Sequence, residues 1–143
     1  MWQLDDATKY VRLGEFDYSE ALTWGSTNPK DLDPKRRERI REHASKKISQ
    51  PRVNELKQQV QWWAFRIFIQ KELVGDDRFD IDNAAKLVVD SFALDTIQRD
   101  QSLYGYLALY EDETLPFVRV VVVMGEPSSA DHTNVEIFGS LEL

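Results

Sequence analysis

The stretch 60–73 constrains the fold of this chain more than any other segment. In an extended chain, its large apolar side chains alternate on one side at Trp63, Phe65, Ile67 and Ile69. Other apolar residues occupy much of the opposite side. A strand that is apolar on both faces has to be covered on both faces, so this pattern predicts an interior strand of a β-sheet.

Two main helices are expected beside this strand. Asp33 and Pro34 have the pattern of an N-cap followed by a proline in the first turn, which predicts a helix over 34–48. A second helix, with a wide apolar surface, is predicted over 83–92 with Asp82 as its N-cap. The segment 25–34 between the early residues and the first helix is rich in turn-forming residues.

Three further strands are predicted over 103–110, 117–124 and 135–141. Residues 1–24 are ambiguous: 8–16 fit a strand, and 18–24 fit a short helical turn. Helices mixed with a small mixed or largely antiparallel sheet make an α+β domain. At 143 residues the chain is expected to form a single domain over 1–143, long enough to bury a core without disulfides.

Composition excludes several classes of protein. There is no cysteine, which removes disulfide frameworks and thiolate metal sites. The first residues lack a secretory signal pattern, and the longest apolar run, 120–124, is far too short to span a bilayer. We therefore expect an intracellular protein that has no membrane partner.

Charge is distributed unevenly along the chain. The net charge of −7 argues against a general nucleic-acid binder. Residues 34–57, however, hold nine Lys and Arg against three Glu, a local charge of +6 that leaves −13 for the rest. A basic segment on an acidic body suggests two surfaces with different roles.

The segment "DIDNAAKLVVD", residues 80–90, gathers charge on one side of the chain. Asp80 and Asp82 leave the same face of an extended segment, and Lys86 and Asp90 follow Asp82 at helical spacing. Close carboxylates repel one another unless a cation lies between them, and oxygen ligands suit Mg²⁺ or Mn²⁺. With a lysine to neutralise phosphate oxygens, this pattern is typical of metal-dependent phosphodiester hydrolysis.

Other interpretations of these charges remain open. Asp82 can serve only as an N-cap, Asp90 can be a solvated helix residue, and Lys86 can form an ordinary surface pair with either of them. A D-x-D pair also occurs in nucleotide-sugar transferases, where the two acids hold Mn²⁺ against a diphosphate.

The full string D-x-D-N-x-x-K-x-x-x-D resembles the signature of RusA-type Holliday junction resolvases, and the resemblance extends over about residues 60–110. This resemblance implies a RusA-like fold and a small homodimeric endonuclease that depends on Mg²⁺. Such enzymes, encoded mainly by phages and prophages, resolve four-way DNA junctions in recombination and repair. The resemblance therefore also implies a cytoplasmic location in a bacterial or phage-infected cell.

The resemblance also implies roles for individual residues. Asp100 lies eighteen residues after Asp82 and matches the last acid of the family pattern. Asp80, Asp82 and Asp100 would then be the catalytic residues that hold the metal, and Lys86 the basic residue near the scissile phosphate. Two further positions match the pattern and would support this site: Asn83 and Asp90.

The basic segment offers a second candidate surface. If it tracks DNA phosphates, the residues that contact DNA would be Arg36, Arg37, Arg39, Arg41, Lys46 and Lys47. A solvated amphipathic helix is an equally good interpretation. Trp62 and Trp63 can stack on unpaired bases, although their place in a predicted strand favours core packing. An alternative function that also fits the acidity is a RusA-like module that binds DNA or protein and cuts weakly or not at all.

Overall fold

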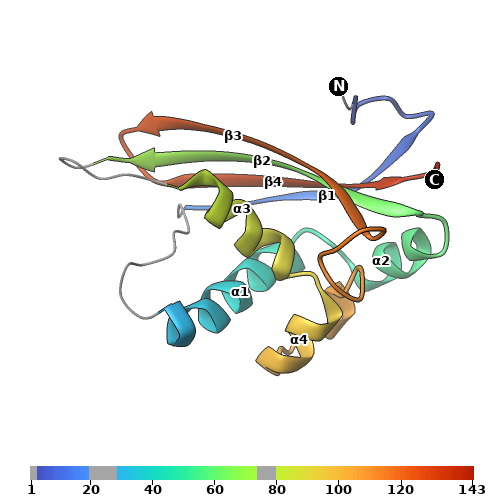
Figure 1. Ribbon diagram of the computed structural model, residues 1–143, viewed down its shortest axis with the longest axis horizontal. Coiled ribbons are helices and arrows are strands. Elements are labelled where there is room, and N and C mark those ends of the chain that lie inside the picture. Colours follow the sequence, from blue (N-terminus) through green and yellow to red (C-terminus); the bar gives the residue numbers. More distant parts are fainter. Residues whose placement is uncertain (1–2, 20–28, 74–79) are drawn as a thin grey trace.

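The computed structural model describes residues 3–19, 29–73 and 80–143. For residues 29–32 it describes the backbone only. Its strands form one four-stranded sheet in the order β1-β4-β2-β3 (Figure 1). The strands are β1 (Tyr10–Tyr18), β2 (Trp62–Glu72), β3 (Val118–Ser128) and β4 (His132–Ser140). β4 pairs antiparallel with both β1 and β2, whereas β2 and β3 are parallel, so the sheet is mixed.

The helices lie on one face of this sheet, as Figure 1 shows. They are α1 (Pro29–Ser45), α2 (Gln50–Lys57), α3 (Ile81–Asp90), α4 (Leu94–Asp100) and a 3₁₀ turn, η1 (Gly105–Leu107). The prediction of an α+β domain is confirmed, and the sheet, predicted as mixed or largely antiparallel, is mixed.

β2 is the interior strand that its double-sided apolar pattern predicts, because β4 and β3 flank it. Phe65 and Ile67 are fully buried under the helices. Trp63 joins this main core, and Trp62 joins a smaller apolar cluster that includes Tyr10. Both tryptophans are buried, which supports their interpretation as core residues rather than base-stacking platforms.

α3 connects β2 to β3, its parallel neighbour. Parallel strands need a crossover segment, because the chain has to return to the starting end of the sheet before the next strand begins. α3 therefore begins near the end of β2 and runs back toward the start of β3. This connection brings the residues just before β3 close to the last turn of α3.

Several predicted elements differ in the structure. The segment 103–110 is not a strand: it contains η1, and its one β-bridge joins Tyr110 to Ala93. The short helices α2 and α4 were not predicted. The ambiguous early segment forms β1, while most of the predicted early helical turn, at 20–24, lies outside the described residues.

Helix starts also differ from the prediction. α1 begins at Pro29, ahead of the Asp33–Pro34 pair. α3 is capped by Asp80 rather than Asp82, since the Asp80 side chain accepts hydrogen bonds from the N–H groups of Asp82 and Asn83. Among the residues that the structure describes, no helix combines the length and apolar composition needed to cross a membrane.

Candidate functional site

The exposed side of α3 forms one wall of a groove, and β3 forms the other. The groove has a volume of about 420 Å³, and the charged residues that line it include Asp82, Lys86 and Asp90 from successive turns of α3. Its floor is apolar and consists of Ala85, Val89, Val118, Val121 and Val123. The structure thus places these three residues on one side of the helix, at the spacing read from the sequence.

Asp80 lies at the start of the same helix. Its Oδ1 accepts hydrogen bonds from the backbone N–H groups of Asp82 at 3.0 Å and Asn83 at 3.3 Å. Both Asp80 and Asp82 are exposed. The cap uses Oδ1, and among the described residues no hydrogen bond to Oδ2 of Asp80 is found.

Asp90 sits at the other end of α3, in a less polar setting. Its Oδ1 is buried and has no hydrogen-bond partner among the described residues. Burial raises the pKa of Asp90 to about 6, and the negative charge of Glu113 adds to this shift, while Lys86 and Arg37 oppose it. Asp90 can therefore exchange a proton near neutral pH.

Glu113 and Arg119 complete the groove, and sequence reasoning missed both. Glu113 belongs to "EDETLP", which lies between the strands predicted over 103–110 and 117–124. The position of these two residues follows from the sheet topology: if β2 and β3 are parallel, the residues just before β3 have to lie near the end of α3. The sheet was predicted only as mixed or largely antiparallel, and no parallel pairing was assigned to these two strands, so this contact was not predicted.

Asp100 is not part of this groove. It ends α4 and binds two arginines of α1, accepting hydrogen bonds from Arg37 Nε at 2.7 Å, Arg37 Nη2 at 2.8 Å and Arg41 Nη2 at 3.1 Å. Its side chain is 2% exposed. Burial opposes ionisation, but the two guanidinium groups outweigh it and hold the pKa of Asp100 below its usual range.

The expected cluster of Asp80, Asp82 and Asp100 is therefore not formed. Arg41, which binds Asp100, also donates through Nε to the carbonyl oxygen of Ser91 at 2.6 Å, so Asp100 lies beside the C-terminal end of α3. Asp80 is at the N-terminal end of α3, eleven residues before Ser91, and eleven residues correspond to about 16 Å along a helix. Within the described ranges, no three acidic or histidine side chains converge to hold a metal ion.

The basic helix also differs from its predicted role. Arg37 and Arg41 lie four residues apart on the buried face of α1, which also carries Ile40 and Ala44. The Arg41 side chain is 0% exposed, so it cannot reach DNA phosphates. Positions 37, 40, 41 and 44 follow the helical repeat of a face that packs against the core. Two of these positions can be arginine because the buried carboxylate of Asp100 lies beside them.

The remaining basic residues of this segment differ in exposure. Arg36 is half-buried, with its Nη1 3.6 Å from Asp33 Oδ1. The others are exposed: Arg39, Lys46 and Lys47. Three of the six basic residues predicted to contact DNA are therefore exposed, and two of these three, Lys46 and Lys47, follow the end of α1.

Asp80 at the start of α3 and Asp82 in the groove nevertheless fit a magnesium ion held by few protein ligands. Mg²⁺ in nucleic-acid enzymes is usually bound by one or two carboxylates, with water and substrate phosphate filling the other positions. Asp80 and Asp82 supply two exposed carboxylates at one helix end, and the unpartnered Oδ1 of Asp90 lies further along the groove. A closed cage of three carboxylates is not required for such a site.

Comparison with known proteins adds no family assignment. No protein-family model matches the chain, and no curated protein matches its sequence. Functional interpretation therefore depends on the motif and on the geometry of the groove.

Proposed function

We propose that this protein is a Mg²⁺-dependent, structure-specific endodeoxyribonuclease of RusA type that acts on branched DNA, above all four-way junctions. The observation that carries the proposal is the groove between α3 and β3. It combines Asp82, Lys86 and Asp90 of the motif with Glu113 and Arg119 at the entrance to β3. Acids that can hold a hard cation and bases that can hold a phosphate line the same surface.

Each residue has a physical role in this proposal. Asp80 and Asp82 would hold the metal at the start of α3, where the helix cap fixes the orientation of Asp80. Bound magnesium would acidify water and withdraw negative charge from the phosphate. Lys86, one turn after Asp82, would bind a phosphate oxygen, and Asp90, one turn further on, would help to orient the Lys86 ammonium group.

A homodimer is part of the same proposal. A four-way junction has two-fold symmetry, and resolution requires two cuts at related positions. A dimer with a two-fold axis would present two grooves to the two strands that are cut.

The decisive experiment is cleavage of a synthetic four-way junction with and without Mg²⁺. We expect the wild-type protein to cut only with the metal, and Asp82→Asn to lose cutting. Asp17→Asn is the matched control, because Asp17 is exposed on β1, the edge strand opposite β3. Absence of cleavage by the wild-type protein, or undiminished cleavage by Asp82→Asn, would remove the proposal.

A second candidate is a module of the same fold that binds branched DNA or a protein partner without cutting. The observation in its favour is that Asp100, the expected third acid, is committed to an internal ion pair with Arg37 and Arg41. This candidate predicts junction binding in a gel-shift assay with no Mg²⁺-dependent turnover.

A further inference from the structure

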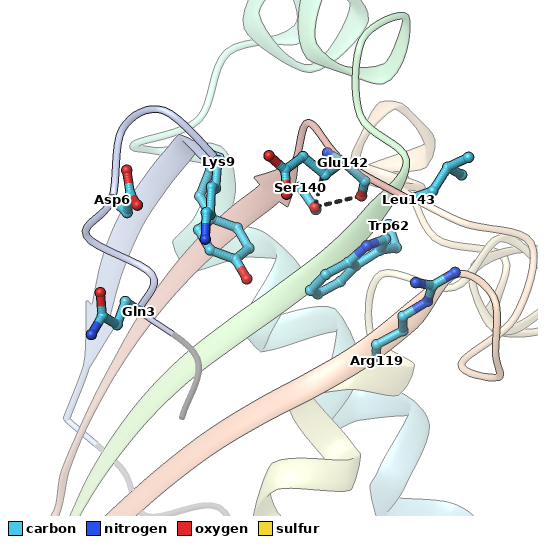
Figure 2. Close-up of a pocket in the computed structure, with 9 residues that line it drawn as sticks. Gln3, Asp6, Lys9, Trp62, Arg119, Ser140, Glu142 and Leu143 are labelled. Carbon is cyan, nitrogen blue, oxygen red and sulfur yellow. Dashed lines mark hydrogen bonds between the residues drawn. The ribbon is translucent and has the colours of Figure 1, made fainter.

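Arg119 lies between two hollows of the molecule. On one side it lines the groove between α3 and β3. On the other it lines a pocket of about 460 Å³ on the opposite side of the sheet, whose further walls include Lys9, Tyr10 and Trp62. Figure 2 shows Arg119 at the edge of this second pocket, next to the Trp62 indole and across from Lys9.

A β-bulge explains this position. Val118 pairs with Trp63 and Val120 pairs with Ala64, so Arg119 is the extra residue that faces no partner on β2. Val118 packs into the main core and Val120 into the smaller cluster on the other side of the sheet. Arg119 is consequently directed out at the sheet edge, from which its long side chain borders both hollows.

Trp62 holds the guanidinium in place. The Arg119 Cζ lies 5.4 Å from the Trp62 ring centroid, within the range of a cation–π contact. The indole itself is buried and packs edge-on against Tyr10, with ring centroids 5.9 Å apart. Arg119 therefore rests on a rigid aromatic surface rather than on a mobile carboxylate.

Among the described residues, Arg119 forms no ion pair with an acid. None of the ion pairs found in the described part of the chain includes it, whereas Arg37, Arg41 and Arg66 each bind at least one carboxylate. Arg119 is also exposed. An exposed guanidinium, held by a neutral ring and facing a groove, has its hydrogen-bond donors available for an anionic ligand.

We propose that Arg119 is a substrate-binding residue of the groove and contacts a phosphate of the DNA backbone from the wall opposite Lys86. A DNA strand would then pass between α3 and β3 with one cation on each side: Lys86 from the helix and Arg119 from the sheet edge. This inference rests on the proposed function, since it takes the backbone of branched DNA as the ligand. It adds the wall of the groove that the sequence motif does not contain.

The test measures DNA binding without chemistry. Binding of a fluorescent four-way junction is titrated by anisotropy in EDTA over a range of NaCl concentrations, for the wild-type protein and Arg119→Gln. Losing one phosphate contact should reduce the slope of log K against log salt by about 0.9 and weaken binding about tenfold or more at low salt. Arg119→Lys should keep the slope, because the positive charge remains, while binding weakens from loss of the planar fork.

Arg99→Gln is the matched control, because Arg99 is exposed on α4 and does not line the groove. If Arg119→Gln binds with wild-type affinity and slope, or if both Gln variants weaken binding equally, the inference is overturned even when the wild-type protein cleaves junctions. If the wild-type protein neither binds nor cleaves them, the inference and the proposed function fail together. A melting curve of each variant shows whether Arg119 only covers Trp62, since that role changes the melting temperature and leaves DNA binding intact.

Discussion

Replacing Asp100 by Asn separates its two interpretations, as a metal ligand and as an internal counter-ion. The carboxylate accepts three hydrogen bonds, from Arg37 at 2.7 and 2.8 Å and from Arg41 at 3.1 Å. Asparagine has nearly the same shape but no charge, and it can accept through one oxygen only. The substitution would leave the buried guanidinium of Arg41 without its main counter-ion.

The cost follows from the burial of both partners. Removing one member of a buried, hydrogen-bonded ion pair typically destabilises a protein by about 3–5 kcal/mol. The Arg41 and Asp100 side chains are 0% and 2% exposed, so solvent cannot screen the remaining charge. Since the amide oxygen retains one acceptor, we expect the lower end, about 3 kcal/mol, or a fall in melting temperature of roughly 10 °C for a chain of this length.

The assay is urea or thermal denaturation in the absence of divalent metal, with Asp17→Asn as the control. Asp17 is exposed and pairs with His132 at the surface, so its substitution should change stability by less than about 1 kcal/mol. The pKa of Asp100 is lowered in the folded state, so its contribution is present above about pH 4 and is lost as pH falls through the lowered pKa. The difference between wild type and Asp100→Asn should therefore shrink in acid.

One result would refute this reasoning. If Asp100→Asn melts like the wild-type protein in EDTA but loses stabilisation by Mg²⁺, Asp100 binds the metal and its pairing with the arginines is not what holds the fold.

Three further predictions concern the groove and the sheet. Asp90→Asn should be more stable than the wild-type protein above pH 6, by up to about 3 kcal/mol, because the raised pKa of Asp90 makes its ionisation unfavourable in the folded state. Near pH 4 the two proteins should have similar stability. Urea denaturation at both pH values tests this. Asp80→Ala should destabilise α3 by about 1 kcal/mol through loss of the cap. Asp80→Asn should keep the cap and lose the Mg²⁺-dependent rise in melting temperature. Equal Mg²⁺ responses of Asp80→Asn and the wild-type protein would count against a role of Asp80 in metal binding. Gly139→Ala should destabilise by about 1–3 kcal/mol, since its new Cβ would lie 2.2 Å from Val60 Cγ2, and Val60→Ala should recover part of the loss in a double-mutant cycle.

The local pattern of the sequence predicted the parts of the fold that depend on neighbouring residues. β2 was predicted from alternating apolar residues and is the interior strand. α3 was predicted from its wide apolar face, and its solvent side carries Asp82, Lys86 and Asp90 at the expected spacing. These features follow from the helical and extended repeats alone, which fix the face that each side chain shares.

Helix boundaries and the segment after α3 were less predictable. Asp80 and Asp82 both precede a helical pattern, and only the backbone geometry decides which of them accepts the capping hydrogen bonds. Residues 103–110 contain apolar residues suited to a strand, yet they pack as a turn beneath the sheet, with Leu107 fully buried. Tertiary packing outweighs local propensity in so short a segment.

The sequence by itself determined which side chains share a surface within one element: the charged side of α3 and the common face of Arg37 and Arg41. Only the tertiary structure decided what those surfaces meet. It turned the arginine face inward against Asp100, and it brought Glu113 and Arg119 to the charged side of α3 through a parallel crossover. The physical reason is that the repeat of a helix or strand fixes only which side chains share a face of that element. Which other segment packs against the face depends on contacts between residues far apart in the chain. In such contacts a charged side chain is buried only beside an opposite charge.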